Sequence, residues 1–268
     1  MNCRVEKSEI SGNIVCPPNK SYTHRAIFLA TLADGKSIIK NILKSGDTYS
    51  TINACKNFGA EIKDVGNDIT VNSTGELKLH SNTIDAANSG TTIRIATAIS
   101  TLSSDKIVLT GDSSLKKRPM QPLLDALESL DAKCSSSNGN PPISISGKIK
   151  GGEVKISGSV SSQFISALMI TAPKLEKGLI LNIQNKLVSK PYIDATIAAM
   201  KKFGAEVKIK TAYKKYIIDK QDYKSTTFAI PSDFSSLALL LSAAVLLGED
   251  ITIQISSGSM PQADEAII

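Results

Sequence analysis

The sequence of 268 residues contains no tryptophan, only two histidines and 4% aromatic residues. Proteins that hold nucleic acids by base stacking need aromatic side chains, so this scarcity argues against a nucleic-acid partner. His24 and His80 have no paired cysteine or carboxylate that would suggest a metal site or a catalytic triad. We therefore expect neither a metal nor a catalytic histidine, and we expect His24 to face solvent or to cap a neighbour.

Paired cysteines, glycine-rich phosphate loops and long apolar runs are also missing. The four cysteines are Cys3, Cys16, Cys55 and Cys134. None forms a Cys-x-x-Cys pair, and this lack of pairing is typical of reduced thiols in a cytoplasmic protein. The most apolar run, residues 237–247, is too short to cross a bilayer, and the charged N-terminus is not typical of a signal peptide. We expect a cytoplasmic protein with no membrane partner.

Arginine is scarce, since only four of the 31 basic residues are arginine. The net charge of +6 fits either a lysine-rich solvated surface or a site for an acidic ligand. Lysine supplies charge anywhere, whereas the planar fork of arginine suits bidentate binding of phosphate or carboxylate. Arg25, Arg94 and Arg118 lie at or near predicted helix starts, beside small polar residues or proline. Their placement favours a small anionic ligand.

Residues 17–25, Pro-Pro-Asn-Lys-Ser-Tyr-Thr-His-Arg, precede an apolar run with helical spacing. The two prolines end any preceding strand, and Ser21 or Thr23 is predicted to cap the helix. A helix start directs free backbone N–H groups and the positive end of its dipole toward one place. Lys20 and Arg25 add two full charges there, so this stretch predicts an anion site.

The order β-α-β-α-β-β recurs along the chain. Landmarks of the repeat are the alanine after each second helix, at Ala60, Ala132 and Ala205, and the helix-opening prolines Pro119, Pro191 and Pro261. In the first copy we predict a strand at 10–16 and a second helix at 47–58. A fourth copy would begin with a strand at 226–230 and a helix at 234–247, and would stop within a helix that starts at Pro261. This pattern predicts an α/β protein and the front part of a longer chain.

Each predicted first helix opens on small polar residues, and packing about a pseudo-threefold axis would bring these starts to one cleft. The openings are Asn19-Lys20-Ser21, residues 88–92, residues 159–163 and residues 232–236. Taken singly, each serine or threonine is better explained by N-capping, whereas the whole set with its basic residues favours ligand binding. Gly90 is either a turn glycine or a place where a ligand approaches the backbone. We expect Asp47 to be an N-cap, and leave Asp233 open.

At five of these stretches the chain resembles the 5-enolpyruvylshikimate-3-phosphate synthase family, particularly its archaeal members. The motifs are PPNKSYTHRA, NSGTTIR, KKRPMQPLLDAL, GSVSSQFISAL and LVSKPYIDAT, in that order along the chain. The resemblance implies an inside-out α/β barrel of repeated β-α-β-α-β-β units and two domains, with the active site between them. It implies one complete domain at 14–228, with 1–13 and 229–268 belonging to an incomplete second domain.

The resemblance further implies transfer of the enolpyruvyl group from phosphoenolpyruvate to the 5-hydroxyl of shikimate 3-phosphate, a step of aromatic amino acid biosynthesis. No cofactor is implied, and the full-length protein is expected to be a monomer. For shikimate 3-phosphate, the motifs indicate Lys20, Ser21, Arg25, Ser161, Ser162, Gln163, Ser189 and Tyr192. For phosphoenolpyruvate, they indicate Lys20, Gly90, Arg94, Arg118 and Gln163. The family's catalytic residues are expected beyond Ile268, so we expect this chain to bind substrate without turnover.

Two alternatives stay open. The sister enolpyruvyl transferase that acts on UDP-N-acetylglucosamine is expected to carry Lys-Asn in its first motif, so Ser21 and Arg25 disfavour it. A non-catalytic domain that binds anions or RNA ends would show steep salt dependence. One departure from the family is Asn19, which stands where many members have serine.

Overall fold

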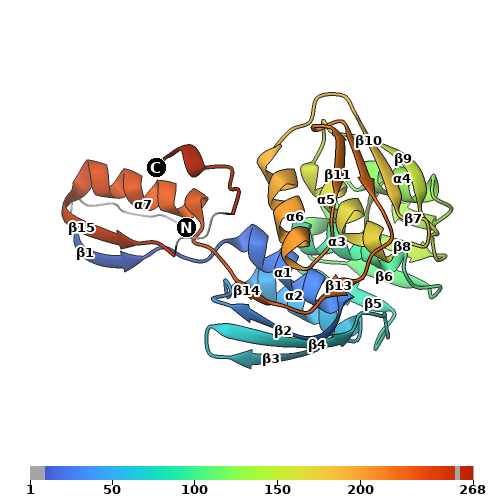
Figure 1. Ribbon diagram of the computed structural model, residues 1–268, viewed down its shortest axis with the longest axis horizontal. Helices are drawn as coiled ribbons and strands as arrows, with labels where there is room; N and C mark the ends of the chain where they lie inside the picture. Colours follow the sequence, from blue (N-terminus) through green and yellow to red (C-terminus); the bar gives the residue numbers. More distant parts are fainter. Residues whose placement is uncertain (1–9, 257–259, 268) are drawn as a thin grey trace.

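The computed structural model describes residues 10–256 and 260–267 and has two lobes of unequal size (Figure 1). The large lobe contains three sheets around a set of packed helices, and the small lobe contains one helix against two strands. No helix in the described ranges is long and apolar enough to cross a membrane. The repeat predicted from the sequence accounts for the large lobe.

Two of the repeated units of the large lobe are contiguous in sequence. One comprises β5 (Thr83–Asp85), α3 (Gly90–Ser100), β6 (Ile107–Thr110), α4 (Gln121–Glu128), β7 (Lys133–Ser137) and β8 (Asn140–Ser146). The other comprises β9 (Gly152–Ser157), α5 (Ser162–Thr171), β10 (Leu179–Gln184), α6 (Pro191–Lys202), β11 (Lys208–Thr211) and β12 (Lys215–Ile218). Their sheets have equivalent orders, β5-β6-β8-β7 and β9-β10-β12-β11, with the first pair parallel and the other pairs antiparallel.

The remaining unit is completed from the far end of the chain. It comprises α1 (Lys20–Leu32), β2 (Ala33–Lys40), α2 (Gly46–Asn57), β3 (Glu61–Val65) and β4 (Asp68–Thr74). Its parallel edge strands are the short β13 (Tyr223–Lys224) and β14 (Thr227–Ala229), both paired with β2. By its register against β2, β14 takes the place that β5 and β9 hold in the other sheets.

The strand predicted at 10–16 is β1 (Ile10–Val15), but its predicted membership of the first copy is wrong. β1 pairs in parallel with β15 (Gly248–Gln254) in the small lobe, so Ile14 and Val15 lie there and not in the large lobe. The strand predicted to open a fourth copy is β14, which belongs to the first. Periodicity identifies a strand but not its partner, and Pro17-Pro18 lies just after β1, where the chain crosses between the lobes. The division into a complete and an incomplete domain stays a prediction.

Two predicted helix starts are also wrong. The helix expected from Pro119 begins at Gln121 with Pro122 in its first turn, after a 3-10 turn η1 (Leu115–Lys117). From Met260 to Asp264 the chain has no α-helix, and only the 3-10 turn η3 (Glu265–Ile267) follows. Proline fits a first helical turn, but it fits an extended approach equally well, so its position alone does not fix the start.

Burial differs sharply between the lobes. Nearly every residue of α1, α3 and α5 is buried, and these helices form the centre of the large lobe. The helix of the small lobe, α7 (Phe234–Leu247), has only Leu237 buried, and it exposes 74% of Leu239, 83% of Val245 and 78% of Leu246.

The lobes are joined where two segments of chain cross side by side. Asn19 N–H donates to Pro231 O at 2.8 Å, and Asp233 N–H donates to Pro17 O at 2.8 Å. The two crossings therefore form a short antiparallel ladder, with Pro18 opposite Ser232. This ladder places the start of α1 beside the start of α7.

Candidate functional site

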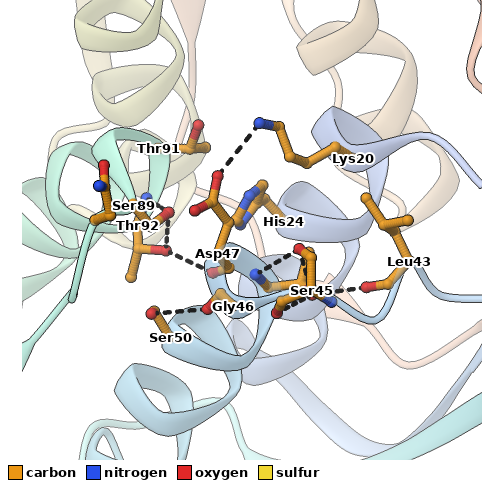
Figure 2. Close-up of polar contacts among 12 residues, drawn as sticks. Lys20, His24, Leu43, Ser45, Gly46, Asp47, Ser50, Ser89, Thr91 and Thr92 are labelled. Carbon is orange, nitrogen blue, oxygen red and sulfur yellow. Dashed lines mark hydrogen bonds and ion pairs between the residues drawn. The ribbon is translucent and has the colours of Figure 1, made fainter. Parts of the chain in front are cut away.

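The first turns of α1, α2 and α3 meet in the large lobe (Figure 2). Lys20 Nζ lies 3.2 Å from Asp47 Oδ2, so the two helix starts are joined by an ion pair. The predicted caps are wrong for the first two helices. Asn19 caps α1, its Oδ1 accepting from Tyr22 N–H at 2.9 Å, and Ser45 caps α2 in a capping box with Thr48. Asp47 lies one residue into α2, where a carboxylate also suits the dipole.

His24 is fully buried, so the prediction that it faces solvent or caps a neighbour is wrong. Its Nδ1 lies 2.6 Å from Thr51 Oγ1, which lies 2.6 Å from Thr92 Oγ1, and Thr92 Oγ1 donates to Ser89 Oγ at 2.7 Å. This chain of contacts links α1, α2 and α3 within the core. Among the described residues, nothing bonds His24 Nε2. Burial lowers the pKa of His24 to about 3, so the ring is neutral at physiological pH.

Acidification is expected to destabilise the parent chain more than a His24→Asn variant. The folded pKa of about 3 lies below the value of 6.5 that an unfolded histidine has. Above pH 6.5 the residue is neutral in both states. Between 6.5 and about 3 only the unfolded state takes up the proton, so up to about 1.4 kcal/mol of unfolding free energy is lost per pH unit.

Denaturant unfolding between pH 6.5 and about 3 measures how steeply the free energy of unfolding of each protein falls with pH. His80 is exposed, so His80→Asn is the matched control and should keep the parent's pH dependence. Parallel curves for the parent and His24→Asn would contradict the prediction.

A cavity of about 420 Å³ lies between the two crossings and α6. Three predicted ligand residues line it, namely Lys20, Ser21 and Tyr192. The small lobe contributes Asp233, whose Oδ2 accepts from Lys20 N–H at 3.2 Å, and Gln262, whose Oε1 accepts from Asn19 Nδ2 at 2.8 Å. The cavity is thus lined by both lobes.

Arg25 lies beneath this cavity with only 2% of its surface exposed, and not in the open cleft that the sequence predicted. Nε donates to Thr196 Oγ1 at 2.8 Å, Nη1 to Ser21 O at 3.0 Å, and Nη2 to Ser166 Oγ at 3.3 Å and Tyr192 O at 3.1 Å. No carboxylate within the described residues pairs with it. Burial lowers the pKa of Arg25 to about 10.

Arg94 and Arg118 converge over Gly90. A methyl group on Gly90 would lie 2.8 Å from Arg118 Nη1 and 3.5 Å from Arg94 Nη1, so only glycine leaves both guanidinium groups in place. Arg118 Nη2 donates to Asn88 Oδ1 at 2.7 Å, and Arg94 lies over the Phe164 ring at 5.1 Å. Burial, and then the charge of Arg118, lower the pKa of Arg94.

Arg94 is connected to the start of α5 through Gln163. Arg94 Nη1 donates to Gln163 Oε1 at 2.5 Å, and Gln163 Nε2 donates to Thr91 Oγ1 at 3.3 Å. Ser161 caps α5 by accepting from Gln163 N–H at 3.2 Å, and Ser162 is buried. The N-capping interpretation of Ser161 is confirmed. Ser189 is exposed in the loop before α6, with a φ of 56°.

Several contributing residues were missed or misjudged from the sequence. They are the ion-pairing Asp47, the arginine acceptor Asn88, the buried hydroxyls Ser166 and Thr196, and Gln262 of the small lobe. Ser166 and Thr196 had a detectable signal, because each is a polar position within an apolar helix and lies four residues after a predicted ligand residue. Gln262 had none, because its contact depends on how the lobes are joined.

The chemistry available here is binding of a small, multiply charged anion. Helix starts, Lys20, Arg94 and Arg118 supply positive potential, and neither Arg94 nor Arg118 has a carboxylate partner among the described residues. Two guanidinium groups held together are stabilised when an anion bridges them. In the described ranges, no group of three or more histidine, cysteine and acidic residues could hold a metal ion.

Comparison with known proteins agrees with a site for a small anionic ligand. A family model described as EPSP synthase (3-phosphoshikimate 1-carboxyvinyltransferase) matches residues 5–268. The chain is 58% identical over 268 residues to the 3-phosphoshikimate 1-carboxyvinyltransferase of Nitrosopumilus maritimus and 48% identical over 276 residues to that of Methanosarcina mazei. These alignments cover all of this chain but 64% and 63% of the relatives.

A solved structure shares the fold. EPSP synthase from Acinetobacter baumannii matches with a TM-score of 0.77 at 24% identity, over 92% of this chain and 56% of that chain. The mixed α/β architecture predicted from the repeat is confirmed by this similarity. The chain therefore spans less than two thirds of the length of the proteins it matches.

Proposed function

Because the chain belongs to the EPSP synthase family, we propose that it provides substrate-binding surface for enolpyruvyl transfer from phosphoenolpyruvate to shikimate 3-phosphate. The transfer forms a bond between the 5-hydroxyl oxygen of the acceptor and the enolpyruvyl carbon and breaks the bond from that carbon to the phosphate oxygen. The hydroxyl proton is lost and inorganic phosphate is released. The observation that carries the proposal is the convergence of Arg94 and Arg118 over Gly90 without a carboxylate partner among the described residues. A ligand with both phosphate and carboxylate suits that pair.

Phosphoenolpyruvate is proposed to lie against Gly90, Arg94 and Arg118, with Gln163 and Lys20 completing its contacts. Arg94 and Gln163 are already bonded to one another, so they form one preorganised unit. Lys20 is held by Asp47 at 3.2 Å, a pair that is half exposed and weak enough to be exchanged for a ligand anion.

Shikimate 3-phosphate is proposed to occupy the cavity of about 420 Å³ lined by Lys20, Ser21 and Tyr192. Ser161, Ser162, Gln163 and Ser189 are proposed to contact its phosphate from the start of α5 and the loop before α6. Arg25 is proposed to act from beneath, through the backbone of Ser21 and Tyr192 and its remaining Nη1 hydrogen.

The test is calorimetric titration of the 268-residue chain with shikimate 3-phosphate, with UDP-N-acetylglucosamine and a short single-stranded RNA as comparison ligands. We expect binding of shikimate 3-phosphate only, and no release of phosphate when phosphoenolpyruvate is added. Turnover is expected to need residues outside these 268, where the resemblance places the proton-transfer groups. Absence of shikimate 3-phosphate binding, or preference for either comparison ligand, would overturn the proposal.

Gly90→Ala is expected to weaken phosphoenolpyruvate binding by about tenfold while it changes the unfolding free energy by less than about 1 kcal/mol. The new methyl group collides only with the far end of the flexible Arg118 side chain, so the fold adjusts at little cost, but the Arg118 guanidinium is displaced. The loss corresponds to one charged hydrogen bond of about 1.5 kcal/mol.

Gly46→Ala provides the matched control, because Gly46 also opens a helix and a methyl group there meets nothing within 4 Å. Titration of both variants with phosphoenolpyruvate, in the presence of shikimate 3-phosphate, separates the effects. Equal affinities would remove Gly90 from the site.

A further inference from the structure

Within the part of the chain that the structure describes, the guanidinium of Arg25 is held by neutral oxygen atoms alone. Its acceptors within the described residues are two hydroxyls, Ser166 Oγ and Thr196 Oγ1, and two backbone carbonyls, those of Ser21 and Tyr192. The hydroxyls come from α5 and α6, whereas Arg25 comes from α1. Three helices are therefore joined around one charge.

The hydroxyl protons in this cluster can be assigned. Thr196 Oγ1 donates its single proton to Tyr192 O at 2.7 Å, so it can only accept from Arg25 Nε and from Ser166 Oγ at 2.8 Å. Ser166 Oγ then donates to Thr196 and accepts from Arg25 Nη2. Each hydroxyl has one acceptor for its proton and at least one donor for its lone pairs. The network is fully directional.

Both carbonyls in the network belong to residues that line the cavity. Ser21 lies in the first turn of α1 and Tyr192 in the first turn of α6, on two sides of the space of about 420 Å³. Arg25 donates to both carbonyls, and Thr196 donates to one of them. The orientation of the fork therefore sets the spacing of these two turns.

We propose that Ser166 and Thr196 are positioning residues: they fix the plane of the Arg25 guanidinium, and through it the Ser21 and Tyr192 sides of the ligand cavity. The inference rests on the proposed function for its ligand, shikimate 3-phosphate. Two hydroxyl groups that only filled space would not need matched proton directions toward a buried arginine.

The experiment compares Thr196→Val and Ser166→Ala with controls that lose an equivalent buried hydroxyl elsewhere. Thr97 donates only to Ile93 O and Ser100 only to Ala96 O, both within α3, so Thr97→Val and Ser100→Ala are the controls. Affinity for shikimate 3-phosphate is measured by calorimetry, below the onset of unfolding for each variant. We expect Thr196→Val to bind about tenfold more weakly, Thr196→Ser to recover to within about threefold, and the controls to bind like the parent.

Coupling to Arg25 sharpens the test. In an Arg25→Lys background, which keeps the charge but lacks the fork, Thr196→Val should have no further effect on affinity. Equal affinity of Thr196→Val and Thr97→Val, or full additivity with Arg25→Lys, would overturn the inference.

A second readout serves if the parent chain binds no shikimate 3-phosphate, a result that by itself counts against the proposed function only. Nuclear magnetic resonance of the arginine Nε–H groups should show a slowly exchanging Arg25 signal in the parent and in Thr97→Val. The signal should lose its protection in Thr196→Val. Unchanged protection would overturn the positioning role whether or not the ligand binds.

Discussion

Replacing Arg25 by methionine is expected to raise the free energy of unfolding by about 1–2 kcal/mol and to weaken shikimate 3-phosphate binding by about 1.5–3 kcal/mol. The two effects have opposite signs because the fold and the ligand use the charge differently. Burial lowers the pKa of Arg25 to about 10, which shows that the folded protein disfavours the charged form. Methionine is an unbranched apolar side chain that reaches about as far as Nε of arginine, and it removes that cost.

The acceptors around Arg25 tolerate its loss. Tyr192 O keeps the Thr196 hydroxyl, Thr196 Oγ1 keeps the Ser166 hydroxyl, and Ser21 is partly exposed, so few polar atoms are left without a partner. Replacing a buried ion pair by well-packed apolar groups is often neutral or stabilising, and a buried charge without a counter-ion bears the desolvation cost with less compensation. A site that costs stability in this way is typical of binding machinery.

Denaturant unfolding and calorimetry measure the two effects on the same samples. Arg25→Ala should destabilise the fold, because it leaves a cavity. Arg118→Met, at a half-buried arginine outside this cluster, is the control for loss of one positive charge. A methionine variant that is less stable than the parent by more than about 1 kcal/mol would show that the four hydrogen bonds outweigh desolvation.

Gly151→Ala is expected to lower the free energy of unfolding by more than about 3 kcal/mol. Gly151 has a φ of 88°, and a methyl group there would lie 2.0 Å from Gly178 O. That carbonyl is not free to move, because it accepts from Gly152 N–H at 3.1 Å. Backbone would have to shift at the entry to β9, in the sheet that leads into α5 and the ligand site.

Gly66→Ala is the control that separates the backbone strain of a positive φ from the steric collision with Gly178 O. Gly66 also has a positive φ, 65°, in the turn between β3 and β4, and a methyl group there meets nothing within 4 Å. It should cost only the left-handed backbone penalty of about 1–2 kcal/mol. Urea unfolding of both variants gives the difference, and equal losses would contradict the collision with Gly178.

The sequence was a good guide wherever local pattern decides the structure. The bounds of α7 and the start of α6 agree with prediction, because apolar spacing and helix-opening residues are local signals. The grouping of Gly90, Arg94 and Arg118 near one place was also predicted, since each lies at a helix start of a repeated unit.

Long-range strand pairing and the burial of polar side chains could not be predicted from the local sequence. The periodicity of residues 10–16 is the same whichever sheet the strand joins, so nothing in it indicated β15. His24 and Arg25 are polar residues in a mostly apolar helix. Whether such residues are buried depends on hydroxyl partners, which here lie 27 and 171 residues away in the sequence. The positions of the His24 and Arg25 side chains are therefore set by these distant partners, which the local sequence does not indicate.

The pairing of β14 with β2 has a consequence for synthesis of the chain. Ile38 meets Thr227, so the sheet that carries the first anion-binding helix gains its edge strand only after some 190 residues have followed. The two contiguous units close from neighbouring sequence, whereas this one must wait with one edge of β2 unpaired. The first of the three units of the large lobe to leave the ribosome is thus the last of them to be finished.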